Sequence, residues 1–378
     1  MIAGGHPFAP PTGERRWVET ATELAAEFAK TTAELDRSAE LPLANLQALH
    51  GSGLDAALLP KDLGGEGLSY RSYGEIVRLV GAACPSTACI WVMHIGAGVG
   101  LAEISAPAAA RFYADELIAG RRFANALSEP ASGNLFMMPM QHAGPVEGGF
   151  SLTGAKRFAS GCEIADHFLV NALVDNTPTF FGLATDPATM TFVPIWDTMG
   201  LRASRSQLIE FTGTLLREDR RCPANRPQRP NRIAAGLAFL SIGIADAALA
   251  ALVEHARRRI LPTTGEPLAR MQWLRFDVAD VHARLEAATM YARNMCWLAD
   301  ENSAEFLPAT MRAKQLANEI AVDAAQLAVR VGGASAGYLR SSPIERIFRD
   351  AQAGGLMAYS LEVCKDTVGA AVLDEPGR

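Results

Sequence analysis

The hydrophobic pattern of this chain changes its period twice, and no other feature of the sequence limits the fold as strongly. From residue 17 to about residue 117, apolar residues recur every three or four positions, as in VETATELAAEFAKTTAEL, which is typical of amphipathic helices. Between residues 122 and 221 the period becomes two, in short segments such as HFLVNALV and LIEFTGTLL. From residue 230 the helical period returns and continues to the end of the chain.

These changes predict an α+β fold in three parts. We expect an N-terminal α-helical domain over residues 1–121, a middle antiparallel β-domain over residues 122–228 and a C-terminal four-helix bundle over residues 229–378. The proline-rich segment CPANRPQRPNR separates the last two parts. Four long amphipathic segments would form the bundle, at about residues 230–260, 267–301, 307–331 and 350–372.

Composition argues against several classes of function. With 378 residues, 49% hydrophobic and 20% charged, the chain can bury a large core. Its net charge of −6 argues against a surface that binds nucleic acid. The six cysteines form no CxxC pair and have no suitably spaced histidines, so we expect reduced thiols and no metal site. The N-terminus does not read as a signal peptide and no membrane-spanning apolar stretch is evident, so we expect no membrane association and a cytoplasmic location.

Five motifs are spread over nearly the whole chain. They are LLPKDLGGEGLSY (58–70), ALSEPASGN (126–134), LTGAKRFASG (152–161), MGLRASRS (199–206) and VGGASAGYLRSSPIERIFRDAQ (331–352). Together with the order of helices, sheet and bundle, they resemble the motifs of the acyl-CoA dehydrogenase superfamily of flavoproteins. The resemblance implies an FAD cofactor, with FMN as an alternative, and a small-molecule substrate that is an acyl thioester. It also implies a homo-oligomer, either a dimer or a tetramer, and an electron-transfer or reductase partner.

The second and third motifs carry the expected contacts with the flavin ring. A flavin has an apolar face and a polar pyrimidine edge, so its site needs a flat hydrophobic surface and a few fixed donors. Ser128 can offer a hydroxyl and an amide to that edge, and Gly133 allows the backbone to approach closely. On the resemblance, Phe158 packs against the ring and Ser160 points its hydroxyl at the reactive N5 region. The cofactor-binding residues expected from the two motifs are Leu127, Ser128, Gly133, Phe158, Ala159 and Ser160. An ordinary turn is the alternative interpretation of SEPASG.

Two further positions match those at which the family contacts the cofactor phosphates. Arg259 follows a long helical segment, although the text after it, R-I-L-P-T, departs from the family's R-x-x-F-G. The pair Gly332 and Gly333 matches glycines that reach the phosphates from a neighbouring subunit. Simpler interpretations stay open, because a helix end favours a cation and a glycine pair can simply end a helix.

The catalytic base of the family is not found where the resemblance places it. Acyl thioester dehydrogenation needs a carboxylate that removes the α-proton while a hydride leaves for flavin N5. The usual position, eight residues after the Asp of the R-D pair, holds Ala358, and Glu362 is the first carboxylate beyond it. We therefore weigh a dehydrogenase with a displaced base, for which Glu362 is the candidate, against two alternatives. One is a flavin-dependent monooxygenase of the same fold, and the other is a catalytically silent partner subunit.

The substrate pocket is expected to include His94, Met357 and Ala358. His94 lies in the apolar segment WVMHIGAG, and a hydrogen-bonded core histidine is the alternative interpretation. The neighbouring Arg349–Asp350 pair resembles a pair of the family that positions the cofactor-side helix, and an ion pair with Glu345 or Glu129 is the alternative interpretation.

Overall fold

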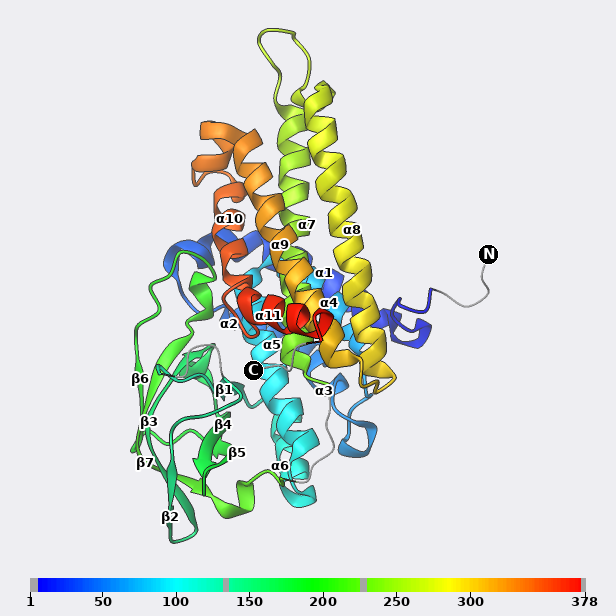
Figure 1. The fold of residues 1–378 in the computed structure, drawn as a ribbon. Coiled ribbons are helices and arrows are strands. Elements are labelled where there is room, and N and C mark those ends of the chain that lie inside the picture. Colours follow the sequence, from blue (N-terminus) through cyan, green and yellow to red (C-terminus); the bar gives the residue numbers. More distant parts are fainter. Residues whose placement is uncertain (1–5, 132–135, 225–229, 375–378) are drawn as a thin grey trace.

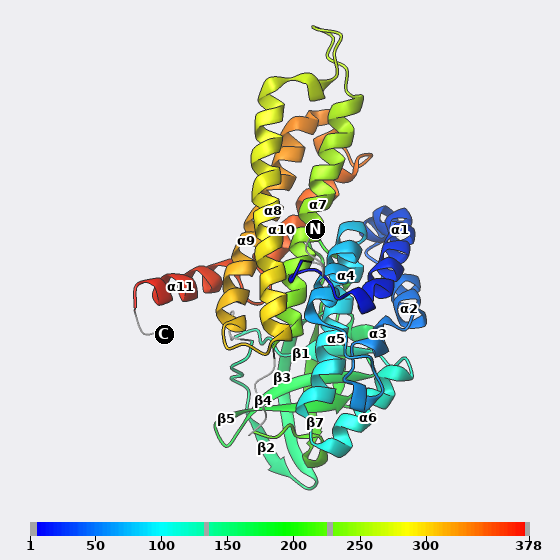
Figure 2. The same ribbon diagram turned by 90° about the vertical axis from the view of Figure 1, so that its right-hand side faces the viewer.

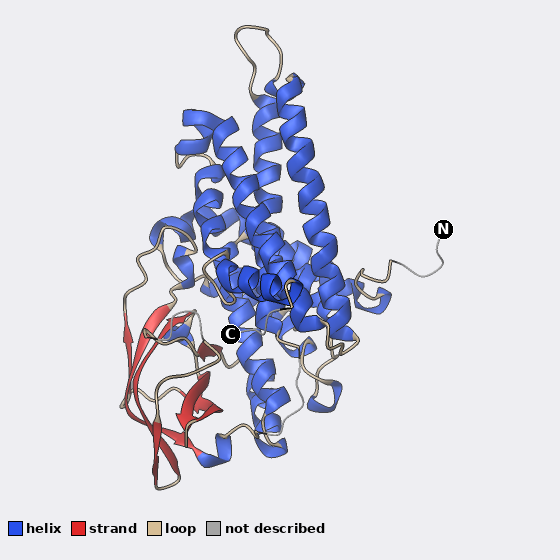
Figure 3. Cartoon of the chain, viewed as in Figure 1, coloured by secondary structure: helices blue, strands red, loops and turns tan. Residues whose placement is uncertain are grey.

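Helices and strands lie in separate parts of the molecule, with the strands gathered at one lower corner (Figure 1 and Figure 3). The structure, a computed structural model, describes residues 6–131, 136–224 and 230–374. The order of helices, sheets and helices confirms the predicted α+β fold.

One of the N-terminal helices, α5, is almost completely buried, because it packs on α4 and α6 and also on the bundle helix α7 and the strand β1. Ser69 caps helix α4 by accepting a hydrogen bond from the Ser72 amide, and a proline begins both α5 and α6. Most residues of α5 are buried, which explains why its sequence lacks a polar face. The helices are α1 (Arg15–Ser38), α2 (Leu43–Gly51), α3 (Leu54–Ala57), α4 (Tyr70–Ala83), α5 (Pro85–Ile104) and α6 (Pro107–Ile118).

Two small sheets form the middle of the chain and share a core. The strands are β1 (Phe123–Ala126), β2 (Ala143–Val146), β3 (Gly149–Ala159), β4 (His167–Val174), β5 (Thr177–Ala184), β6 (Met190–Val193) and β7 (Gln207–Arg217). One sheet has the order β1-β4-β5 and the other the order β2-β3-β7-β6. Apolar side chains of both sheets, including Leu152, Phe168 and Phe211, meet in one buried cluster. The pairing is antiparallel except between β1 and β4, which are not consecutive in sequence and run parallel.

Three long helices and a shorter one make the C-terminal bundle. These are α7 (Arg232–Arg258), α8 (Gln272–Asp300), α9 (Phe306–Gly333) and α10 (Pro343–Gly354). The Asn231 side chain caps α7. Helix α7 also packs closely on α4, because a Cβ atom at Gly243 would lie 2.4 Å from the Arg78 carbonyl oxygen.

The expected helix over residues 350–372 is wrong as a single element. Helix α10 ends at Gly354, and α11 (Leu361–Val372) begins after an irregular stretch. Gly354 and Gly355 weaken the helix, and Ser360 starts a new one by accepting a hydrogen bond from the Val363 amide. Figure 2 shows α11 projecting from the side of the bundle.

Two helices need a correction to the expectation that no stretch could span a membrane. By length and composition, α5 and α7 are long and apolar enough. However, 78% and 67% of their most apolar windows are buried inside the protein, as in core helices, so the test is weak evidence for a membrane span.

Candidate active site

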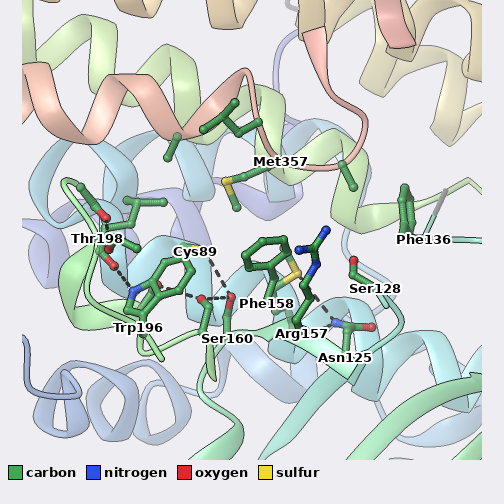
Figure 4. Close-up of a pocket in the computed structure, with 18 of the residues that line it drawn as sticks. Cys89, Asn125, Ser128, Phe136, Arg157, Phe158, Ser160, Trp196, Thr198 and Met357 are labelled. Atoms are coloured by element: carbon green, nitrogen blue, oxygen red, sulfur yellow. Dashed lines mark hydrogen bonds between the residues drawn. The ribbon is translucent and has the colours of Figure 1, made fainter. Parts of the chain in front are cut away.

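A cavity of about 390 Å³ lies where the sheets meet the helices (Figure 4). One wall comes from β1, β3 and the loop after β1, through residues such as Ser128 and Phe158. The opposite wall comes from the end of α10 and the stretch after it, including Met357 and Ala358. Most of the lining is apolar, so a ligand here would be held largely by hydrophobic contact.

A bulge in β3 shapes the sheet wall. The register of β3 against β7 shifts between Lys156 and Ala159, and Phe158 has a positive φ of 59°. Two consecutive side chains, Arg157 and Phe158, therefore face the cavity while their neighbours point into the protein (Figure 4). The Phe158 side chain is 51% exposed, which leaves much of its ring free to contact a ligand. The expected contact residue Ala159 is instead fully buried in the core between the sheets.

The loop after β1 is fixed against this bulge. The Arg157 amide donates a hydrogen bond to the Ser128 carbonyl oxygen at 2.8 Å. Leu127 and Ser128 thereby join the cavity lining beside Phe158, as the two motifs predict. Gly133 lies outside the described residues.

A buried ion pair anchors the same loop to the sheet. The Lys156 ammonium lies 2.7 Å from a Glu129 carboxylate oxygen and 2.9 Å from the Asn171 side-chain oxygen. The amides of Met140 and Gln141 also donate to Glu129. Burial lowers the pKa of Lys156, although the pair with Glu129 opposes that effect. Glu129 thus has a structural role in holding this loop.

A row of hydroxyls lies at the base of the cavity. The Ser160 and Ser206 hydroxyl oxygens are 2.7 Å apart, and those of Ser206 and Ser204 are 2.9 Å apart. The Cys89 sulfur lies 3.8 Å from the Ser160 hydroxyl. Burial raises the pKa of the Cys89 thiol to about 11, so it is a neutral thiol at neutral pH rather than a nucleophile. Ser160, as expected, presents a hydroxyl in the cavity lining.

Charged residues of α10 hold the helical wall in place. The Arg349 guanidinium pairs with Asp36 at 2.6 Å and with Glu345 at 2.8 Å, the second as in the alternative interpretation. Asp350 is buried and accepts a hydrogen bond from the Leu201 amide at 2.7 Å. Burial, with the nearby charge of Asp36, raises the pKa of Asp350 to about 7. Close packing fixes this contact, because a Cβ atom at Gly200 would lie 2.3 Å from the Arg349 carbonyl oxygen.

Among the described residues that line the cavity, none is an aspartate, a glutamate or a histidine. Met357 and Ala358 line it as expected, so the position expected for a base carries a methyl group. Glu362 is exposed near the start of α11 and is not part of the lining. The break between α10 and α11 separates the two positions that a continuous helix would have placed one turn apart.

His94 belongs to a buried polar cluster and not to the cavity lining. Its Nδ1 atom accepts a hydrogen bond from the Phe123 amide at 3.0 Å, so this nitrogen carries no proton. Its Nε2 atom then carries the proton and faces the Asp55 carboxylate at 3.3 Å. The indole of Trp91 donates to the same carboxylate at 2.7 Å. His94 is therefore not part of the described cavity lining, and the core-histidine interpretation describes its contacts; its role in a substrate pocket stays a prediction.

Arg259 and the glycine pair lie far from the cavity. Arg259 directly follows the end of α7, and Gly332 and Gly333 end α9. Both helix ends lie at the top of the bundle, whereas the sheets lie at the bottom (Figure 1). Within one chain, these three residues do not join the other expected cofactor contacts.

Two cavity residues were missed by sequence reasoning. Asn125 donates through its side-chain nitrogen to the Met93 carbonyl at 2.8 Å, but its buried side-chain oxygen has no partner among residues 6–131, 136–224 and 230–374. The buried Nε atom of Arg157 also has no partner within these residues. A polar residue inside the apolar strand FANA was the available signal for Asn125. No sequence pattern indicates the bulge that turns the Arg157 side chain toward the cavity.

Comparison with known proteins extends over almost the whole chain. The family model for the acyl-CoA dehydrogenase N-terminal domain matches residues 12–121, and that for the C-terminal domain matches residues 230–373. A 3-sulfinopropanoyl-CoA desulfinase of Paraburkholderia xenovorans is 28% identical and covers 96% of both chains. The human mitochondrial short-chain specific acyl-CoA dehydrogenase is 26% identical, over 90% of this chain and 85% of its own.

Solved structures show the same fold. Butyryl-CoA dehydrogenase from Megasphaera elsdenii superposes with a TM-score of 0.87 at 23% identity, covering 95% of this chain and 98% of its own. FMN-bound TdsC from Paenibacillus sp. A11-2, a dibenzothiophene monooxygenase, has a TM-score of 0.85 at 22% identity, with 96% and 98% covered.

Proposed function

Since the chain belongs to the acyl-CoA dehydrogenase family, we propose that it is an FAD-dependent oxidoreductase acting on an acyl thioester. The observation that carries this proposal is the sheet wall of the cavity, where the half-exposed ring of Phe158 lies between the serines of the two motifs. Two of the relatives, the desulfinase and the short-chain dehydrogenase, are both named for an acyl-CoA.

The lining residues fit a flavin ring. Phe158 offers an aromatic face, and Ser128 and Ser160 offer hydroxyls at its sides. The side-chain oxygen of Asn125, which has no partner in the described part of the chain, is a buried acceptor that needs a donor, and a flavin carries N–H donors on its polar edge. When bound, the flavin supplies a hydride acceptor. FMN is the alternative cofactor, since TdsC has an FMN-bound structure.

The helical wall is where the acyl group would bind. Leu356, Met357 and Ala358 present apolar surface opposite Phe158, which suits an acyl chain laid against the ring. The family's α,β-dehydrogenation is the reaction we rank first. Ala358 occupies the position expected for the base of this reaction, and the described lining contains no carboxylate.

The missing carboxylate favours a second candidate. A flavin-dependent monooxygenase needs no α-proton base, and the fold is shared with the monooxygenase TdsC. A silent partner subunit is the third reading, in which the chain completes a site for another protein. In either active form, an electron-transfer or reductase partner would exchange electrons with the flavin. A cytoplasmic location stays a prediction.

A second copy of the chain would complete the cofactor site. The remote positions of Arg259, Gly332 and Gly333 support a homodimer or homotetramer in which these residues reach the phosphates of a partner's cofactor. Among the described residues, helix α11 contributes one fully buried residue, Cys364, and leaves Val372 73% exposed, which suits an assembly contact.

The proposal is tested by loading purified protein with FAD or FMN and removing unbound flavin by gel filtration. We expect a yellow protein. We expect Phe158→Ala to weaken flavin binding at least about tenfold, because the variant loses one aromatic contact with the ring. Phe276→Ala is the matched control, because Phe276 is 65% exposed on α8 and outside the cavity lining. A protein that binds neither flavin refutes the proposed function.

Anaerobic mixing with butyryl-CoA and longer acyl-CoAs then separates the readings. Bleaching of the flavin absorbance supports dehydrogenation. Product formation that requires both oxygen and an external flavin reductase supports monooxygenation. A flavoprotein inactive in both assays supports the silent partner.

A further inference from the structure

Of the two arginines among the described residues that line the cavity, one has no charged partner in the described chain. Arg157 and Arg349 both line the cavity, but Arg349 is held by two carboxylates at 2.6 and 2.8 Å. Within the described residues, Arg157 forms no ion pair, and its buried Nε atom has no hydrogen-bond partner. Arg157 as a whole is partly buried, but its buried Nε atom lies beside an apolar surface without an acceptor, which favours a ligand that supplies negative charge or acceptor atoms.

The bulge of β3 fixes which part of a ligand Arg157 meets. The guanidinium carbon lies 4.7 Å from the centre of the Phe158 ring, and the Arg157 amide is bonded to Ser128. Arg157 therefore lies on the sheet wall between the aromatic residue and the serine expected at the polar edge of the flavin (Figure 4). An acyl substrate would lie against the opposite wall, so the nearest ligand atoms belong to the flavin ring.

We propose that Arg157 tunes the flavin, holding a positive charge against the polar half of the ring and so favouring its reduced form. This inference rests on the proposed function. Reduction adds two electrons and one proton to the oxidised ring, which leaves one additional negative charge on the pyrimidine side. The Arg157 guanidinium stabilises that charge more than the neutral oxidised ring, because it is fixed in a partly buried site.

The linkage between binding and reduction makes this measurable. If Arg157 makes the protein bind reduced flavin more tightly than oxidised flavin, removing Arg157 lowers the midpoint potential of the flavin. The size of the shift follows from the change in the ratio of the two affinities. We expect Arg157→Met to reduce that ratio by about 10- to 100-fold, which corresponds to roughly 30 to 60 mV for a two-electron couple. Methionine keeps an unbranched side chain of similar length but removes the charge. Arg157→Lys keeps the charge, so its midpoint potential should stay close to that of the wild type.

The experiment uses the flavin-loaded full-length protein, reduced by xanthine and xanthine oxidase in the presence of a reference dye. Arg217→Met is the matched control, because Arg217 lies in the same sheet region, is exposed and pairs with Asp219 at 2.8 Å outside the cavity. The affinity for oxidised flavin is measured for each variant by fluorescence quenching. Thermal unfolding of the apoprotein checks that Arg157→Met folds, as expected for a side chain that points out of the core.

An Arg157→Met potential equal to that of Arg217→Met would overturn the inference. So would an unchanged potential in Arg157→Met combined with a loss of affinity for a dicarboxylic acyl-CoA and none for butyryl-CoA, since Arg157 would then bind an acidic substrate. A wild-type protein that binds no flavin would instead refute the proposed function, and this inference with it.

Discussion

Replacing Glu129 by Gln removes one charge from a pair that water does not reach. The Lys156 and Glu129 side chains are 0% and 2% exposed, and their charged atoms lie 2.7 Å apart. Glutamine keeps the shape of the side chain and can still accept from the Met140 amide, which donates to Glu129 at 2.9 Å. The main change is that the buried ammonium of Lys156 loses its counter-charge.

The expected cost is large because the remaining charge stays buried. Breaking a buried pair by removing one partner typically costs about 3–5 kcal/mol, whereas an exposed pair contributes about 0–1 kcal/mol. The chain offers a matched control in Lys30 and Glu27, which are 66% and 67% exposed and 2.6 Å apart. We expect Glu129→Gln to lower the free energy of unfolding by about 3 kcal/mol or more, and Glu27→Gln by less than about 1 kcal/mol.

The pH dependence of Glu129→Gln gives an independent check of the cause. Burial already lowers the pKa of Lys156 in the folded state, and loss of Glu129 lowers it further. Between that pKa and the unfolded value of about 10.4, the unfolded chain binds more protons, so stability rises with pH. The variant should therefore recover stability toward alkaline pH more steeply than the wild type does.

Urea unfolding followed by tryptophan fluorescence at pH 7 and pH 9.5 measures both effects. The double variant Glu129→Leu with Lys156→Met should recover much of the loss, because it buries no charge. The reasoning is refuted if Glu129→Gln costs no more than Glu27→Gln, or if its stability does not rise with pH. Flavin binding should weaken together with stability, since Glu129 holds the loop that carries Ser128.

Three further predictions concern the helical wall. Ala358→Glu should increase the rate of anaerobic flavin bleaching by butyryl-CoA at least tenfold over Ala358→Gln, because general-base catalysis contributes about 10²–10⁴-fold; equal rates would remove Ala358 from the position of the base. Glu362→Gln should leave that rate within about twofold of wild type, since Glu362 is exposed and outside the lining, and a larger loss would restore Glu362 as a candidate base. Wild-type stability should fall as pH rises from about 4 to about 7, because the pKa of Asp350 is raised in the folded state and the folded chain binds more protons there. Asp350→Asn should flatten that part of a urea-derived stability profile while keeping the acceptor for the Leu201 amide; an unchanged profile would show that Asp350 is not its source.

The fold could be predicted from sequence because its parts differ in period. Long runs at the helical period gave α1 and the bundle helices, and alternation gave the strands. The helix across residues 350–372 failed because apolar spacing continues through Gly354 and Gly355, while the cap at Ser360 acts locally and restarts the chain in another direction. The parallel pairing of β1 with β4 could not be predicted, since pairing between non-consecutive strands leaves no local pattern.

The candidate site was predictable where motifs carry it. Leu127, Ser128, Phe158 and Ser160 line one cavity, as their two motifs indicate. The structure places His94 and Ala159 in buried clusters outside the described lining. Both occur in apolar segments, where sequence alone does not tell a pocket-facing side chain from a core-facing one. The contributions expected of Arg259 and the glycine pair depend on a second copy, and so stay predictions.

The extra residue in β3 also lets one strand pack into the core and line the cavity at adjacent positions. Lys156 and Ala159 serve the interior, while the two positions between them face outward into the ligand space. Selection, or an engineer building a combinatorial library at these two codons, can therefore exchange the chemistry presented there while the hydrophobic interior of the sheets stays as it is. Deleting one of the two codons would instead restore a regular strand, and the side chains after the deletion would then point to the opposite face of the sheet. In this stretch a change of length is therefore far more damaging than a change of residue.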